Sequence, residues 1–267
     1  MKMSCIPLCF SQQIKKDKTM TIEDWIPMAV DLNLDAIEIY EPWLFGRDDD
    51  AMKKLSDSVH DAGLEVSMYT PESNFSNPAE RADSIAHTKR CVDNAKIFGT
   101  NIVRITAASH TLVGAVSIER GPKRDAAIES IAEGLKGCLD YAAENGITLA
   151  LEDHPAVGTN IADFMKMLEL IDDDRVKVNL DTANVRDTTT VELAQNVASR
   201  VVHTHISELL DNKHGCVIGK GNVDFKGIFS VLKSHGYDDW ISLEQLSGDK
   251  DDLHFSVEHI RSVWNSV

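Results

Sequence analysis

Short runs of apolar residues alternate along the chain with longer stretches in which apolar positions recur at helical spacing. At several joints a glycine precedes the apolar run, as in 62-AGLEV, 98-FGTNIV, 145-NGITL and 235-HGYDDWI. Glycine just beyond a helix is a common C-terminal stop. The pattern therefore predicts a repeated order of helix, glycine and strand.

Eight strands are expected, each followed by a helical segment. We place them at residues 4–9, 36–40, 65–69, 101–107, 148–152, 177–181, 201–205 and 240–244. Strict alternation predicts a parallel sheet in an α/β protein, and eight units without a remainder favour a closed (β/α)8 TIM barrel over an open sheet. Because neither a linker nor a glycine-rich nucleotide motif interrupts the chain, residues 1–267 are expected to form a single domain.

Helix starts are also marked in the sequence. Thr21 lies three residues before Asp24, which is the spacing of a capping box. Asn77 followed by Pro78 predicts an N-cap with proline at the first helical position.

Strand parity separates polar from apolar side chains, because alternate residues face opposite sides. In 148–152, Leu149 and Leu151 share one face and Glu152 lies on the other. Later strands repeat the pattern: Asn179 and Asp181 oppose Val178 and Leu180, His203 and His205 oppose Val202, and Ser242 and Glu244 oppose Ile241 and Leu243. Since the helix-facing side of a barrel is apolar, we expect the polar series to point inward and to end at the C-terminal end of the barrel, where active sites lie.

Composition narrows the classes of function. With 43% hydrophobic and 26% charged residues the chain is typical of a globular protein, and a formal net charge of −16 disfavours nucleic acid as a partner. Five cysteines without a CxxC pair fit a reducing cytoplasm. The start, MKMSCIPLCF, is read as a strand and not as a leader peptide, and no apolar run reaches the roughly 20 residues of a membrane span.

Four of the inward positions carry metal-binding chemistry. Glu152, Asp181, His205 and Glu244 end the fifth to eighth predicted strands. Neighbouring strands lie about 4.8 Å apart, so these side chains can converge on one ion. Three carboxylates and an imidazole suit a divalent cation, with Mn²⁺ the best match and Mg²⁺, Co²⁺, Fe²⁺ or Zn²⁺ as alternatives.

Taken one at a time, each of these residues is more often a capping or ion-paired structural group. Together, three carboxylates would repel one another without a cation, and Arg104 and Lys177 are the only obvious counter-charges on the strands. The set of four therefore favours a metal.

The segments LALEDHP, NLDTAN, HTHISE and WISLEQL, with 219-GKGNVDF-225, resemble the xylose isomerase-like barrels of the sugar phosphate isomerase/epimerase group. The resemblance implies that Glu152, Asp181, His205 and Glu244 bind one divalent metal, often Mn²⁺, and that both glutamates act as bases. It also places His154 and Asn184 at positions used for substrate.

Further candidates come from the residues alone. His203 lies beneath His205, where support and substrate contact are both open, and the loop after the seventh strand offers His214, Lys213 and Lys220 to a substrate oxygen. A solvated role is the ordinary one for such lysines.

Two departures from relatives restrict the function. Ketose 3-epimerases tend to carry an arginine where this chain has Asp211 and Lys213, and relatives that repair abasic DNA need histidines where it has Thr106 and Asn184. The second departure and the acidic charge both disfavour an endonuclease.

The expected function is a metal-dependent isomerase or epimerase of a keto sugar or sugar phosphate. Glu152 and Glu244 would remove and return a proton next to the carbonyl through an enediolate. The alternative is a dehydratase or other lyase on a keto sugar or keto-cyclitol, of the inosose dehydratase kind. A sugar-binding barrel with a degenerate site is disfavoured because all four ligands are present. The expected partner is a small-molecule sugar, and a homo-oligomer stays open.

Overall fold

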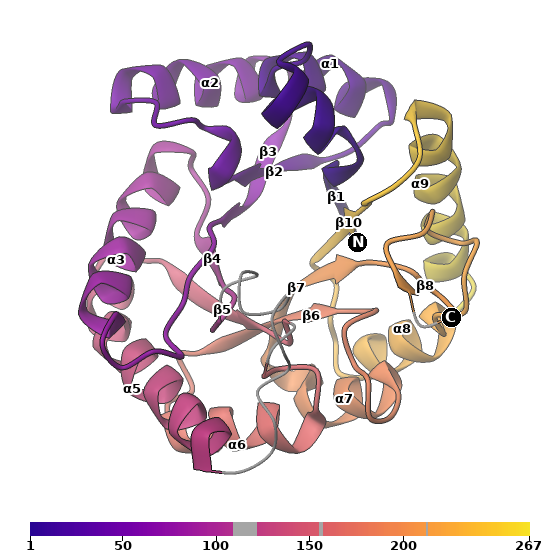
Figure 1. The fold of residues 1–267 in the computed structure, drawn as a ribbon. Helices are drawn as coiled ribbons and strands as arrows, with labels where there is room; N and C mark the ends of the chain where they lie inside the picture. Colours follow the sequence, from indigo (N-terminus) through magenta and orange to yellow (C-terminus); the bar gives the residue numbers. More distant parts are fainter. Residues whose placement is uncertain (109–121, 155–156, 212) are drawn as a thin grey trace.

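Eight parallel strands form a nearly closed barrel with helices around it (Figure 1). This computed structural model describes residues 1–108, 122–154, 157–211 and 213–267. The prediction of a (β/α)8 TIM barrel is confirmed. It follows from the alternation of buried strands and amphipathic helices, since a parallel strand needs a crossover before the next strand can pair with it.

The barrel strands follow one another around the ring in the order β1-β10-β7-β6-β5-β4-β3-β2. Their bounds are β1 Lys2–Ile6, β2 Ala36–Tyr40, β3 Glu65–Thr70, β4 Ile102–Ile105, β5 Thr148–Glu152, β6 Lys177–Asp181, β7 Val201–Ile206 and β10 Trp240–Glu244. At the seam between β1 and β2, the Asp35 N–H donates to the Met3 carbonyl at 2.8 Å and the Met3 N–H donates to the Asp35 carboxylate at 2.7 Å.

The outer layer consists of helices that follow the strands. Their bounds are α1 Ile22–Asp31, α2 Asp49–Asp61, α3 Arg81–Ile97, α5 Pro122–Glu144, α6 Ile161–Ile171, α7 Thr190–Val197, α8 Phe225–Ser234 and α9 Lys250–Asn265. Short helices at η1 Leu8–Phe10, η2 Gln12–Asp17, η3 Glu41–Trp43 and η4 Ala198–Arg200 lie at the joints. A small hairpin, β8 Leu209–Leu210 with β9 Lys213–His214, follows β7 and was not predicted.

One predicted helix start is confirmed and another is wrong. Thr21 and Asp24 form a capping box at the start of α1. Asn77 does not cap α3, which begins at Arg81, because Asn77 Oδ1 accepts instead from the Ala79 N–H at 3.1 Å in the preceding turn.

Two predicted strands are longer than the observed ones. β1 ends at Ile6, where the chain turns into η1, and β4 ends at Ile105. Beyond β4, Ala107 has φ +61°, which an extended strand cannot contain, and the Thr106 N–H donates to Ser73 Oγ at 3.1 Å in place of a strand neighbour.

The apolar core has two parts, divided by the sheet. The larger part packs the outward-facing strand residues under the helices, and a small inner cluster fills the barrel with Ala36, Met68, Ile102, Ala150 and Trp240. Val202 also packs against the inner cluster and not under the helices as predicted, because the β6–β7 register shifts at this point. The polar strand ends lie beyond this inner cluster, toward the C-terminal ends of the strands.

Candidate metal centre

Glu152, Asp181, His205 and Glu244 converge at the C-terminal end of the barrel. Each offers one ligand atom within 4.8 Å of those of the others. His205 Nδ1 lies 2.6 Å from Glu152 Oε1 and 3.8 Å from Glu244 Oε2. Three of the four are fully buried, whereas the Glu244 side chain is 12% exposed and faces the mouth of the barrel.

Ser207 bridges two of these carboxylates. Its hydroxyl lies 2.9 Å from Asp181 Oδ2 and 2.9 Å from Glu244 Oε2. Asp181 Oδ1 accepts from the Ala183 N–H at 2.7 Å, and the Asp181 N–H donates to Asp153 Oδ1 at 2.7 Å. Because one hydroxyl proton cannot serve both carboxylates at once, Ser207 leaves one of them short of a donor.

Glu152 is held as an anion by its neighbours. Arg104 donates to Glu152 Oε2 at 3.3 Å, and Asn179 Nδ2 donates to Oε1 at 3.2 Å. Burial by itself raises the pKa of Glu152, but Arg104 and His205 outweigh burial and lower that pKa well below its usual range. Lys177, the other predicted counter-charge, is the first residue of β6 and therefore lies at the opposite end of that strand from Asp181.

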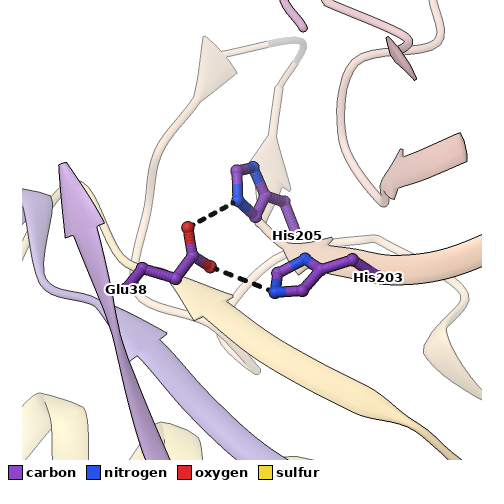
Figure 2. A group of neighbouring side chains, drawn as sticks. All are labelled: Glu38, His203 and His205. Carbon is purple, nitrogen blue, oxygen red and sulfur yellow. Dashed lines mark hydrogen bonds and ion pairs between the residues drawn. The ribbon is translucent and has the colours of Figure 1, made fainter. Parts of the chain in front are cut away.

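Glu38 of β2 lies between the two imidazoles of β7 (Figure 2). Glu38 Oε2 is 3.2 Å from His205 Nε2, and Oε1 is 3.6 Å from His203 Nε2. Glu38 also accepts from Thr70 Oγ1 at 2.7 Å and from the Ser242 hydroxyl. A carboxylate on Nε2 favours the proton at that nitrogen, so Nδ1 is the nitrogen that faces the other candidate ligands and that would bind a cation after losing its own proton.

Sequence reasoning missed Glu38, although the signal was present. The sequence of β2 is AIEIY, in which Glu38 lies on the face opposite Ile37 and Ile39. The same alternation identified Glu152 in β5. Burial raises the pKa of Glu38, but His205 and His203 lower it to a net value of about 2, so the carboxylate is ionised.

The group as a whole is short of positive charge. Burial lowers the pKa of His205, yet Glu38, Glu152 and Glu244 raise it to well above its usual value. Burial also raises the pKa of Glu244 to about 8, with Asp181 and Glu152 raising it and His205 opposing them. The raised pKa values mean that His205 and Glu244 bind protons, which offset part of the negative charge of the group. A bound divalent cation would offset this charge directly.

The donor set fits such a cation. Three carboxylates offer hard oxygen atoms and His205 offers one nitrogen. Mn²⁺, Mg²⁺, Co²⁺, Fe²⁺ and Zn²⁺ all accept ligands of these kinds.

The predicted substrate residues divide into two groups. His154 and Asn184 are buried at the ends of the β5 and β6 segments, on the same side of the barrel as the four candidate ligands. His203 is fully buried beneath His205, with Nδ1 2.9 Å from Asn179 Oδ1, which places it in a supporting layer.

The loop candidates behave differently from one another. Lys220 is not brought to the group, because its Nζ pairs with Asp252 at 2.7 Å and lies over the Phe255 ring, both in α9. His214 is brought to the group, with Nε2 3.8 Å from Asp181 Oδ1. Burial lowers the pKa of His214, but its contact with Asp181 raises that pKa to a net value above the usual one.

The fold and this group together define a (β/α)8 barrel with a candidate metal centre at its C-terminal end. Residues 26–263 match the family described as xylose isomerase-like TIM barrel, and the chain belongs to that family. This confirms the resemblance carried by the strand-end motifs.

Relatives include enzymes of two kinds. An L-ribulose 3-epimerase from Mesorhizobium japonicum is 26% identical over 176 residues, which cover 63% of this chain and 55% of that protein. An inosose dehydratase from Lacticaseibacillus casei is 25% identical over 172 residues, which cover 55% of this chain and 58% of that protein. The chain therefore matches little more than half the length of either relative.

A solved structure matches the fold over the whole chain. The D-psicose 3-epimerase of Clostridium cellulolyticum H10, crystallised with D-tagatose, superposes with a TM-score of 0.79 at 16% identity, covering 100% of this chain and 99% of that chain. At this identity the match shows the shared fold alone. Among the described residues, no helix is both long and apolar enough to cross a membrane.

Proposed function

We propose that the protein is a divalent-metal-dependent isomerase or epimerase of a keto sugar or sugar phosphate. The observation that carries this proposal is the convergence of Glu152, Asp181, His205 and Glu244 at the end of the barrel where active sites of this fold lie. Residues 1–267 would act as one domain.

When bound, the cation would polarise the substrate carbonyl and offset the negative charge that grows on its oxygen, and Mn²⁺ suits the donor set best. Asp181 and His205 would mainly hold that cation. Asp181 is fixed by the Ala183 N–H and Ser207, and His205 is fixed by Glu38.

The two glutamates would move the proton. Glu244 is the most exposed of the four, so its carboxylate can meet a C–H group of a substrate in the mouth of the barrel. Glu152 lies deeper, where Arg104 and Asn179 fix its orientation, and would face the substrate from the other side. His154 and Asn184 would contact substrate hydroxyl groups.

The second candidate function is a dehydratase, in which the same proton abstraction is followed by loss of a leaving group. Return of the proton to the opposite face gives an epimer, and transfer to the neighbouring carbon gives an isomer. Departure of a hydroxyl from the next carbon gives a dehydrated product. The inosose dehydratase relative, about as similar as the epimerase, favours this alternative.

A product screen in D₂O separates these reactions. The Mn²⁺-loaded protein would be incubated with keto sugars, their phosphates and keto-cyclitols, and the products would be identified by NMR. An epimerase with two opposed bases should place deuterium at the inverted carbon of the product, with little label in unreacted substrate.

An unsaturated product without a stereoisomer would establish the lyase instead. Absence of both turnover and C–H exchange for all of these substrates, in protein with full metal content, would contradict both candidates. A metal-free protein that still binds sugar would identify a degenerate binding barrel.

A further inference from the structure

A second group of metal-binding side chains lies outside the barrel interior. Glu41 is the first residue of η3, directly after β2, and His87 and Cys91 are in α3. The last two are four residues apart, so they share one face of the helix. One ligand atom from each of the three lies within 4.8 Å of the others.

The distances in this group are close to those of a zinc site. His87 Nε2 lies 3.5 Å from Cys91 Sγ and 3.0 Å from Glu41 Oε1, and Cys91 Sγ lies 3.6 Å from Glu41 Oε1. Zinc bonds of about 2.0–2.3 Å at tetrahedral angles place the ligand atoms about 3.3–3.6 Å apart. The two distances to the sulfur fall in this range, and the nitrogen–oxygen distance is about 0.3 Å shorter, so a small shift of His87 or Glu41 would give the three atoms the spacing of three corners of a tetrahedron.

Two further side chains hold the carboxylate in place. The Tyr69 hydroxyl donates to Glu41 Oε1 at 3.3 Å, and Asn94 Nδ2 donates to the Tyr69 oxygen at 3.0 Å. Asn94 lies on the same face of α3 as His87 and Cys91, seven residues after His87. Burial and then Glu41 raise the pKa of Tyr69, which keeps its proton available for this bond. Such outer partners orient ligands in known metal sites.

The three side chains of this group differ in their exposure to solvent. The His87 side chain is 29% exposed and the Glu41 side chain is 24% exposed, whereas Cys91 is fully buried. His87 and Glu41 therefore link the group to solvent, from which the site would take an ion and a water ligand. Burial raises the pKa of Cys91, and Glu41 raises it further, so the thiol and the carboxylate would both gain from a nearby cation.

Without a metal, His87 pairs with Glu41 and the Cys91 thiol donates a long hydrogen bond to Glu41 Oε1. The pairing of His87 with Glu41 does not require a thiol at 3.5–3.6 Å from both partners. We propose that Glu41, His87 and Cys91 form a second divalent-metal site, of the zinc type, with water as the fourth ligand.

This site would fasten η3 to α3 through Glu41 and His87, which are 46 positions apart in the sequence. Its sulfur ligand distinguishes it from the strand-end centre, since thiolate favours Zn²⁺ or Co²⁺ over Mn²⁺ and Mg²⁺. The proposal does not depend on the sugar chemistry.

Cobalt titration of the full chain tests this site directly. Bound Co²⁺ should produce a thiolate-to-cobalt charge-transfer absorption, which the sulfur-free strand-end group cannot give. The band should be lost in Cys91→Ser. It should persist in Asp181→Asn, which impairs only the strand-end group, and in Cys138→Ser, which replaces a different buried thiol that donates to the Gly134 carbonyl at 3.4 Å.

His87→Gln gives a second test at a position that is 29% exposed and therefore tolerant of change. Its cobalt affinity, followed at the same band, should fall at least about tenfold, the loss typical even of outer partners in metal sites. A wild-type protein without the band at several equivalents of Co²⁺ would overturn the proposal. A band of wild-type intensity in Cys91→Ser, or an unchanged affinity in His87→Gln, would overturn it as well.

Discussion

Glu38 Oε2 lies 3.2 Å from Nε2 of His205, so a carboxylate from β2 reaches across the barrel to an imidazole from β7 (Figure 2). This pair fixes the nitrogen that His205 presents to the other candidate ligands. The same carboxylate faces Nε2 of His203 at 3.6 Å. The orientation of the imidazole at the strand-end centre therefore depends on a residue that does not itself belong to that centre.

Replacement of Glu38 by glutamine should weaken the strand-end metal site. A neutral amide does not hold a proton on His205 Nε2 as a carboxylate does. The substitution also removes the negative charge that makes the His205 ring a stronger metal ligand. We expect Mn²⁺ affinity to fall about 10- to 100-fold, measured by competition with a chelator. Thr204→Val is the matched control, since Thr204 is a buried residue of β7 whose hydroxyl donates to the Trp240 carbonyl at 3.0 Å. Unchanged affinity in Glu38→Gln would refute the role.

Direct ligands should behave differently from nearby loop residues. Asp181→Ala and His205→Ala should each remove most Mn²⁺ binding at micromolar metal, because each deletes one of four donors. Lys213→Ala should bind Mn²⁺ as the wild type does, since Lys213 is exposed. Bound metal would be measured after gel filtration. An equal loss in all three variants would show that the centre lies elsewhere.

Most of the barrel could be predicted from the alternation of strands and helices, and the four converging residues from strand parity. A period of two placed Glu152, Asp181, His205 and Glu244 on the inward side, and parallel strands brought their ends to one place. The same parity places Glu38 of AIEIY on the inward side, although its strand carries no other charged residue to mark it.

Contacts between distant surface segments could not be predicted in this way. The Lys220 side chain points to Asp252 and Phe255 of α9. No local sequence pattern shows that this helix lies next to the loop of Lys220. Likewise, the approach of Glu41 to His87 depends on how η3 packs against α3. Such packing is a tertiary property that periodicity does not encode.

Arg104 should stabilise the folded protein through Glu152. Both side chains are buried, so Arg104→Met would leave Glu152 with His205 as its remaining cationic partner and should lower the free energy of unfolding at pH 7, by up to about 3–5 kcal/mol. Urea unfolding with EDTA present would measure this loss. Folding lowers the pKa of Glu152 below its ordinary value of about 4.3, so the stabilisation is complete above that value and is lost as the pH falls through the folded pKa.

The difference in free energy of unfolding between wild type and Arg104→Met should accordingly become smaller below about pH 4. Arg104→Lys should retain part of the charge interaction and lie between the two. A gap of constant size across this range would attribute the loss to packing and not to charge.

Replacement of Gly134 in α5 by alanine should destabilise the protein, although this substitution ordinarily stabilises a helix. Alanine in place of glycine usually stabilises a helix by up to about 1 kcal/mol. A Cβ at Gly134 would instead collide with the ring of the fully buried Phe75. We expect Gly134→Ala to destabilise the protein by about 1–3 kcal/mol in urea unfolding.

Gly137, one turn later in the same helix, is the control for this prediction. Its Cβ would meet only the end of the flexible Ile85 side chain, so Gly137→Ala should be neutral or stabilising. Equal destabilisation by both substitutions would show that the contact with Phe75 is not the cause.

Glu244→Gln should separate proton transfer from metal binding. The amide oxygen can still coordinate a cation, and the Ser207 hydroxyl, 2.9 Å from Glu244 Oε2, can still donate to it. The amide cannot accept a proton, so turnover should fall by at least about 10²- to 10⁴-fold while much of the Mn²⁺ is retained. Metal content, substrate binding by calorimetry and turnover of the identified substrate would be measured on the same sample. Loss of metal in parallel with turnover would make Glu244 chiefly a ligand. Wild-type turnover in both Glu244→Gln and Glu152→Gln would exclude the two-glutamate mechanism, whereas loss of turnover in both, with the metal retained, is the result this mechanism requires.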